Sequence, residues 1–252
     1  MTLCVTDIYR HPIKAHGVEA LTSVALATGK CMPWDRVWAV AEEGRTLDYD
    51  APEWVSCRNF TRGAKAPELM AISAKVNEAT GTVDLTHPRA GSITFDPSDA
   101  ASVAAFIAWS KPLTPANRMA PEQIYSVPEV GLTDSDWPSV SINLHSSLQA
   151  LEAQTGASLS PLRFRGNIWL NGASPWQEFD WVGKEIRIGS VRLQVRERIE
   201  RCLATTVNPE TGRRDVNTLD ALKNGWGHRD FGVKAFVLQG GNVNVNDIVE
   251  VL

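Results

Sequence analysis

The chain has 252 residues, of which 43% are hydrophobic and 21% are charged, as is ordinary for a soluble globular protein of one large or two small domains. Its formal net charge of −4 argues against nucleic acid or an anionic membrane as a partner, so any anionic ligand needs a local cluster of cations. No apolar run reaches the ~18–20 residues that span a bilayer, and the N-terminus lacks a signal-peptide pattern. We therefore expect a cytoplasmic protein.

Short strand-like runs separated by turn signals dominate the first hundred residues. Strands are predicted over 3–9, 20–27, 36–42, 69–76, 82–86 and 92–95. Pro12 cannot donate to a ladder, so the first strand ends before it and Lys14 lies in the following loop. An alanine-rich helix is predicted over 100–109, with Ser98 as its N-cap. A proline-rich stretch follows, and we place a domain boundary near residue 120.

The second part opens with a predicted helix over 144–154, where leucines recur at helical spacing. Gly156 stands where a C-cap glycine would, and Asn143 or Ser141 could cap the other end. A helix N-terminus offers free N–H groups to an anion, so Ser141, Asn143 and Ser147 are candidate ligand contacts. Capping without a ligand is the plainer alternative.

A strand is predicted over 163–170, and by its parity Arg163, Arg165 and Asn167 share one face. Guanidinium groups match phosphate geometry bidentately, and an amide offers both donors and an acceptor. We therefore predict an anion-binding face here, with an ordinary solvated strand face as the alternative.

Four more strands are predicted, over 185–188, 191–203, 231–239 and 243–252, with a helix over 215–223. Within 191–203 an uninterrupted strand would place Arg196, Arg198 and Glu200 on the face of Cys202. The Glu200 carboxylate would raise the thiol pKa unless one of these arginines pairs with it.

Four cysteines are scattered along the chain, at positions 4, 31, 57 and 202, without a C-x-x-C pair. Structural zinc and iron–sulfur sites are therefore not indicated. We interpret Cys4, Cys31 and Cys57 as small buried or incidental residues. Cys202 differs because it follows Arg201, whose positive charge favours the thiolate, which is a nucleophile and a soft metal ligand.

Several motifs, in their order along the chain, resemble one family, the C-terminal domain of molybdenum cofactor sulfurase, called the MOSC domain. They are Arg163–Asn167, Trp176–Trp181 with Gly183, Arg201-Cys202, Thr206–Gly212, Phe231-Gly232-Val233 and Asp247-Ile248-Val249. The first hundred residues, with Tyr9–Lys14 and Trp34–Trp38, resemble the β-barrel domain that often precedes it. The resemblance implies a mainly β fold, with a β-barrel-like domain over 1–120 packed on a MOSC-type β-barrel over 121–252 and a few peripheral helices.

This resemblance implies that a pocket between the two domains holds molybdenum cofactor. Cys202 would be the catalytic residue and the thiolate ligand of molybdenum. Lys14, Arg36 and Arg165 would neutralise the phosphate, although Lys14 could equally be a solvated loop residue and Arg36 a surface partner of Asp35. The residues expected to bind the cofactor are Lys14, Arg36, Ser141, Asn143, Ser147, Arg163, Arg165 and Asn167. Ala15 and Glu200 depart from the family pattern, which often has serine at both positions.

The resemblance also implies a reaction, the reduction of N-hydroxylated substrates such as amidoximes, as in the mitochondrial amidoxime-reducing component and its bacterial relatives. Electrons would come from a separate ferredoxin- or cytochrome-type protein. The alternative is a non-redox carrier that binds molybdenum cofactor or holds sulfur as a Cys202 persulfide. A pyridoxal-phosphate domain, which sulfurases also carry, does not fit in 252 residues. A third possibility is a cofactor-free barrel that binds another anion.

Overall fold

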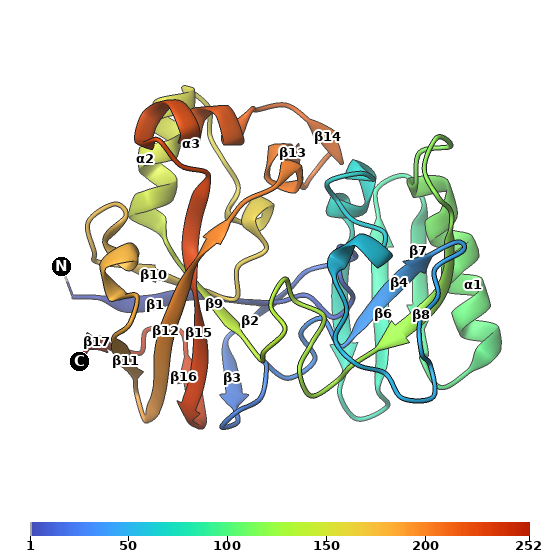
Figure 1. Ribbon diagram of the computed structural model, residues 1–252, viewed down its shortest axis with the longest axis horizontal. Coiled ribbons are helices and arrows are strands. Elements are labelled where there is room, and N and C mark those ends of the chain that lie inside the picture. Colours follow the sequence, from blue (N-terminus) through green and yellow to red (C-terminus); the bar gives the residue numbers. More distant parts are fainter. Residues whose placement is uncertain (1) are drawn as a thin grey trace.

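The computed structural model describes residues 2–252, which form two lobes side by side (Figure 1). The larger lobe is built on one curled sheet of eight strands, ordered β17-β11-β12-β15-β9-β10-β1-β2. Its strands are β1 (Cys4–Arg10), β2 (Glu19–Leu21), β9 (Val140–Leu144), β10 (Ile168–Asn171), β11 (Glu185–Ile188), β12 (Val191–Glu200), β15 (Asp230–Gln239) and β17 (Val249–Val251). All neighbours pair antiparallel except β9 and β10, which run parallel.

One face of this sheet is buried, as its alternating sequence requires. In β12, Val191, Leu193 and Val195 are fully buried while Arg192 between them is exposed. The mainly β fold with few helices is thereby confirmed. The sheet does not close into a barrel within residues 2–252, however, because β17 and β2 remain its edges, although Cys4 bridges Ile248 next to β17.

The smaller lobe carries the remaining longer strands and one helix. Its elements are β4 (Trp38–Glu42), β5 (Ser73–Asn77), β6 (Thr82–His87), β7 (Gly91–Phe95), α1 (Ala100–Ser110) and β8 (Pro121–Ser126). Strands β5, β6 and β7 form a meander, β4 pairs with β8, and Phe106 of α1 packs into the core between them. The domain boundary near residue 120 stays a prediction, since β8 follows it in the chain but pairs with β4.

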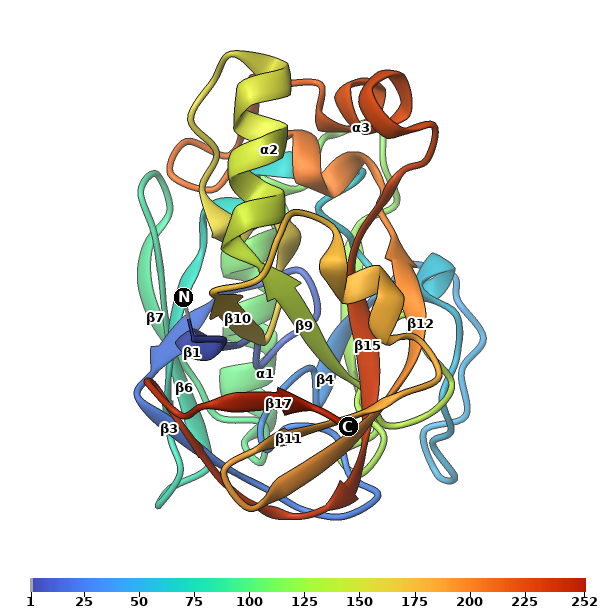
Figure 2. The same ribbon diagram turned by 90° about the vertical axis from the view of Figure 1, so that its left-hand side faces the viewer.

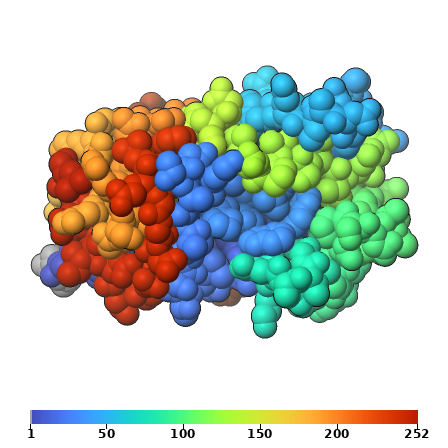
Figure 3. Space-filling view, turned by 90° about the horizontal axis from the view of Figure 1, so that it is seen from below, coloured from blue at the N-terminus to red at the C-terminus, as the bar shows by residue number. Residues whose placement is uncertain are grey.

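The N-terminal segment ties the lobes together. β1 and β2 lie in the large sheet, and β3 (Ser23–Leu26) pairs with β16 (Gly241–Asn244) from the other end of the chain. The space-filling view shows this blue segment between the red C-terminal part and the green and cyan smaller lobe (Figure 3). Two short strands, β13 (Val207–Asn208) and β14 (Arg213–Arg214), pair with each other and lie between the two lobes (Figure 1).

The structure corrects the capping predictions at two helix N-termini and confirms the one at a C-terminus. The N-cap of α1 is Asp99 and not Ser98, because both Asp99 carboxylate oxygens accept hydrogen bonds from the first free N–H groups. Helix α2 (His145–Thr155) follows β9 directly and has no side-chain cap, so the capping roles of Asn143 and Ser141 are wrong. Gly156 has the left-handed conformation expected of a C-cap glycine.

The predicted elements near the proposed ligands need larger corrections. Residues 163–170 are not one strand: Pro161–Phe164 form a 3₁₀ turn, Arg165 is left-handed with φ 48°, and only β10 continues. Ser160 and Pro161 explain this, since Ser160 caps the turn and proline suits its first position. Arg163 and Arg165 therefore do not share a strand face.

Other boundaries shift as well. The strand predicted over 20–27 is divided into β2 and β3, and the first half of 69–76 is a 3₁₀ turn, Pro67–Ala71. β12 ends at Glu200, so Cys202 stands just before the 3₁₀ turn Leu203–Thr206. The last predicted strand is two, β16 and β17, and β16 pairs with β3 from the N-terminal part of the chain.

Helix α3 is Thr218–Trp226, capped by Asn217, and begins three residues later than predicted. Figure 2 shows α2 and α3 together at one end of the sheet. None of the helices within residues 2–252 is long and apolar enough to cross a membrane.

Candidate functional site

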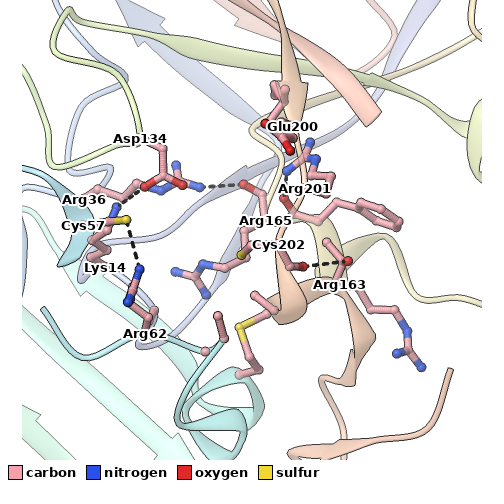
Figure 4. Close-up of a pocket in the computed structure, with 18 residues that line it drawn as sticks. Lys14, Arg36, Cys57, Arg62, Asp134, Arg163, Arg165, Glu200, Arg201 and Cys202 are labelled. Atoms are coloured by element: carbon pink, nitrogen blue, oxygen red, sulfur yellow. Dashed lines mark hydrogen bonds and ion pairs between the residues drawn. The ribbon is translucent and has the colours of Figure 1, made fainter. Parts of the chain in front are cut away.

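A cavity of about 190 Å³ opens where the two lobes meet, and a smaller hollow of about 80 Å³ adjoins it through shared lining residues (Figure 4). Six cationic side chains and two carboxylates line the larger cavity, namely Lys14, Arg36, Arg62, Arg163, Arg165, Arg201, Asp134 and Glu200. An excess of positive charge in a partly enclosed space is what an anionic ligand requires. The acidic chain thus concentrates cations at this one site.

Cys202 is exposed and lines this cavity. It lies two residues beyond the end of β12, where the N–H and hydroxyl of Thr205 both donate to its carbonyl, at 3.2 and 3.1 Å. Figure 4 shows it across the cavity from Lys14 and Arg62. The larger lobe therefore presents a thiol to cations of the smaller one.

Arg201 serves as a clamp behind Cys202. Its guanidinium donates to the carbonyls of Phe231 (2.8 Å) and Phe164 (2.7 Å) and to Oδ1 of Asn143 (3.0 Å). Burial lowers its pKa to about 9, so it remains charged at neutral pH. These three bonds join β15, the Pro161–Phe164 turn and β9, and thereby hold the backbone that carries Cys202.

Arg36 is held over the cavity by a buried acid. Its guanidinium contacts the Asp35 carboxylate and donates to the Arg165 carbonyl at 2.6 Å. Asp35 is fully buried and accepts a 2.7 Å bond from the His11 N–H, so the alternative of an Asp35–Arg36 surface pair is wrong. Burial acts to raise the pKa of Asp35, but the charge of Arg36 and the hydrogen bonds from His11 together outweigh it and hold that pKa well below its ordinary value.

Lys14 is also buried and paired. Its ammonium donates to the Leu132 carbonyl (2.7 Å) and to Asp134 (2.8 Å). Desolvation opposes ionisation of Asp134, yet the charge and hydrogen bond of Lys14 lower the Asp134 pKa to about 2. Lys14 is thus not a solvated loop residue, and Asp134 is a site residue that sequence reasoning missed.

Arg165 and Arg62 keep the most unused donor capacity. The side chain of Arg165 makes one long bond, 3.4 Å to the Ile13 carbonyl, and burial with the charge of Arg36 lowers its pKa to about 9. Arg62 donates to the thiol sulfur of Cys57 at 3.4 Å. Both guanidinium groups can therefore bind an anion in the cavity. Arg62 and Cys57 carried no sequence signal, because folding alone brings their loop to this site.

Ser141 and Asn167 line the smaller hollow, but largely satisfy one another. The N–H and hydroxyl of Ser141 donate to Oδ1 of Asn167 at 3.1 and 2.9 Å, and the Asn167 N–H returns a bond to the hydroxyl at 2.8 Å. The Asn167 amide also donates to the Tyr9 carbonyl at 3.2 Å. Few hydrogen-bonding groups of either side chain therefore remain free to contact a ligand directly.

Three of the residues predicted to contact the cofactor direct their side-chain polar groups away from the cavity. Asn143 and Ser147 are fully buried and line neither hollow: Asn143 accepts from Arg201, and Ser147 donates to both Glu178 oxygens at 3.0 Å. Arg163 reaches the cavity wall, but its guanidinium turns away to Asp215 at 2.7 Å (Figure 4). The structure therefore gathers Cys202, Lys14, Arg36, Arg165, Ser141 and Asn167 around the cavity and its hollow.

The Asn143 side chain fills a space that exists because residues 166 and 232 are glycines. A Cβ atom at Gly166 would lie 2.0 Å from its Nδ2, and one at Gly232 would lie 2.3 Å from its Oδ1. Glu178 lies beyond this space, fully buried, and burial raises its pKa to about 7. We call Arg201, Asn143, Ser147 and Glu178 the polar floor of the site.

Comparison with known proteins agrees with this architecture. Residues 2–115 match the MOSC N-terminal beta barrel domain, and residues 135–250 match the MOSC domain. Because the two matches together cover most of the chain, the protein belongs to the MOSC family.

The individual proteins that match this chain either share little sequence identity with it or match only part of its length. Molybdenum cofactor sulfurase of Homo sapiens is 39% identical over 61 residues, which make up 24% of this chain and 7% of that protein, so the chain matches only a small part of its length. The YuaD protein from Bacillus subtilis covers 100% of this chain and 96% of its own at 12% identity and a TM-score of 0.47. YiiM from Geobacillus stearothermophilus covers 45% and 53%, at 15% identity and a TM-score of 0.35.

Proposed function

We propose that the cavity binds molybdenum cofactor and that the protein is an oxidoreductase acting on N-hydroxylated substrates. One observation carries this proposal: an exposed thiol, Cys202, faces a set of guanidinium groups across a single cavity between the lobes. MOSC membership and the partial likeness to a molybdenum cofactor sulfurase support the cofactor class.

The residues present fit the chemistry of that cofactor. A thiolate at Cys202 is a soft ligand that suits molybdenum, and Arg165 and Arg62 keep donors for a phosphate. Lys14 and Arg36 add positive charge while remaining bonded to acids of the protein. The bound cofactor would supply the redox chemistry, and the chain would supply ligation, charge neutralisation and orientation.

The overall reaction consumes two electrons and two protons. The N–O bond of the substrate breaks, the nitrogen takes up one of the protons, and the hydroxyl leaves with the other as water. We assign electron delivery to a separate ferredoxin- or cytochrome-type protein. Glu200 also lines the cavity, and within residues 2–252 it makes no ion pair with Arg196 or Arg198.

Metal analysis tests the cofactor. The protein is purified from a host that makes molybdenum cofactor, and molybdenum and oxidised pterin are measured in wild type, Cys202→Ala and Cys57→Ala. We expect near-stoichiometric molybdenum in wild type and in Cys57→Ala, whose thiol lines the same cavity, and a large loss in Cys202→Ala. Absence of both metal and pterin from all three proteins would exclude the proposed function.

The exposed position of Cys202 also suits a carrier that transfers cofactor or sulfur without redox turnover. Benzamidoxime reduction with reduced methyl viologen separates the two functions. Turnover by wild type that is lost in Cys202→Ala supports the reductase. Bound cofactor without turnover, or cyanide-releasable sulfur on Cys202, supports the carrier.

A further inference from the structure

A second concave surface adjoins β12 at Arg198. This open groove of about 570 Å³ has aromatic walls made by Trp176, Phe179, Trp226 and His228, with Arg198 and Asp180 at its edge. Arg198 lines the groove and the next residue, Ile199, lines the cavity, so the two sites adjoin neighbouring residues of the same strand. Figure 2 looks onto this end of the larger lobe, where α3 ends above β12 and β15. We call this surface the indole groove.

Its rings are tightly clustered although the two indoles are only partly buried. The ring centroids of Trp176 and Trp226 are 4.5 Å apart, those of Phe179 and His228 are 5.3 Å apart, and the Arg198 guanidinium lies 4.2 Å over Phe179. Trp176 also has a left-handed backbone with φ 66°, which is rare for a bulky residue. The fold holds it there by a 2.8 Å bond from its N–H to Ser147. Strain of this kind at a partly exposed aromatic residue suggests a function.

Aromatic rings continue from the indole groove to the cavity. Trp176 packs edge-on against Phe231 at 5.8 Å, and Phe231 stacks on Phe164 at 3.9 Å. Both phenylalanines are buried, and Phe164 lines the cavity together with Cys202. Core packing accounts for the two buried rings. The two indoles at the outer end of the same row pack against this core but remain partly exposed, so each also presents ring surface to the groove.

We infer that the indole groove is the docking surface for the protein that delivers electrons, and that electrons cross from it through Trp176, Phe231 and Phe164 to the cavity. This inference rests on the proposed function, which needs two electrons from outside the cavity. Electron tunnelling weakens steeply with distance and with gaps in packing, and this row of contacting rings leaves no gap. Two one-electron transfers oxidise two carrier molecules for each N–O bond reduced, and the two protons enter from solvent.

The composition of the indole groove indicates what kind of carrier fits. Tryptophan and arginine are the residues most enriched at energetically important interface positions. Arg198 and Asp180 line the groove, Arg198 lies 4.0 Å from Asp230, and Lys223 bonds the Gly227 carbonyl next to His228. The partner that we infer is a small one-electron carrier that presents its redox group to these rings. A limited contact area is typical of such transient complexes.

The test compares two electron sources on the loaded protein. Benzamidoxime reduction is driven either by reduced [2Fe–2S] ferredoxin, an acidic carrier, or by reduced methyl viologen, which needs no docking surface. In Trp226→Leu we expect the ferredoxin-driven rate to fall roughly tenfold, as for an interface anchor, while the viologen-driven rate and molybdenum content stay at wild-type values. Trp137→Leu is the matched control, because Trp137 also carries a stacked arginine, Arg196 at 4.8 Å, but does not belong to the ring row.

Binding is measured independently of turnover by calorimetric titration with oxidised ferredoxin. Trp226→Leu should weaken binding, whereas Phe231→Leu, a core substitution that should lower the melting temperature, should keep wild-type ferredoxin affinity and viologen-driven turnover but slow ferredoxin-driven turnover. Equal ferredoxin affinity in wild type and Trp226→Leu overturns the docking surface, and wild-type turnover in Phe231→Leu overturns the ring path. Ferredoxin that fails to drive a wild-type protein active with viologen also overturns it. A wild type inactive with both reductants contradicts the proposed function instead, and the titration still decides whether ferredoxin docks.

Discussion

The polar floor of the site differs from the part of the cavity formed by Arg165 and Cys202, which we call the mouth. Polar and charged side chains are used in opposite ways in these two regions. In the floor, Arg201 places all of its hydrogen bonds on protein acceptors, and Asn143 and Ser147 are fully buried. At the mouth, Arg165 makes one long bond and Cys202 is exposed. Charge in the floor therefore serves the fold, whereas charge at the mouth is available to a ligand. The two regions should respond to substitution in different ways.

The largest effect is expected at Arg201. Replacing it by Met removes the donors for two carbonyls and for Oδ1 of Asn143, and unsatisfied buried acceptors each cost about 1–3 kcal/mol. We expect the free energy of unfolding to fall by about 3 kcal/mol in urea denaturation, with loss of cofactor because the Cys202 backbone is released. Arg192→Met, at an exposed arginine of the same sheet, is the control and should change little. A stable Arg201→Met protein would remove the distinction between floor and mouth.

Glu178 gives the floor a pH dependence of defined sign. Burial raises its pKa from 4.5 to about 7, so between these values the folded state holds a proton that the unfolded state has released. Stability must then decrease as pH rises across this window, at no more than about 1.4 kcal/mol per pH unit, and level off above it. Urea unfolding of wild type and Glu178→Gln at pH 5.0, 6.0 and 7.5 checks this. The variant should lose the decrease, and parallel curves for both proteins would contradict the assignment.

At Arg165, in the mouth, a substitution should reduce cofactor retention and leave stability almost unchanged. Arg165→Gln removes a guanidinium that makes one long bond within the protein, so we expect the free energy of unfolding to stay within about 0.5 kcal/mol of wild type. Cofactor retention should fall roughly tenfold, as for the loss of one charge-assisted hydrogen bond. Molybdenum retained after dialysis measures this, with Arg163→Gln as the comparison, because its guanidinium bonds Asp215 outside the cavity. Unchanged retention in Arg165→Gln would place the anion elsewhere.

Part of the fold and of this site could be predicted from the local sequence. Alternating residues predicted most strands, including β1, β6, β7 and β12, and Gly156 was predicted correctly as a C-cap. Motifs pointed to Lys14, Arg36, Arg165 and Cys202, and the fold places all four at one cavity. Each of these inferences depends on short-range chemistry, such as side-chain parity and the conformational freedom of glycine.

The failed predictions share a cause. Parity placed Arg163 beside Arg165 only on the assumption of a strand, and the Ser160-Pro161 turn with a left-handed Arg165 sends the two guanidinium groups apart. Asn143 and Ser147 seemed available at a helix start, but that helix packs against the sheet and both side chains are buried in the floor. Local pattern identified the polar residues without showing whether protein or ligand would satisfy them.

By itself, the sequence determined the mainly β architecture, the turns and the residue types that suit an anionic, thiolate-ligated cofactor. Tertiary structure alone decided which side chains meet at the cavity. Arg62 and Asp134 come from loops far apart in the chain, and the row from Trp226 to Phe164 also joins distant residues. Such contacts depend on how the lobes and helices pack, which is set by burial summed over the whole core and not by any local pattern.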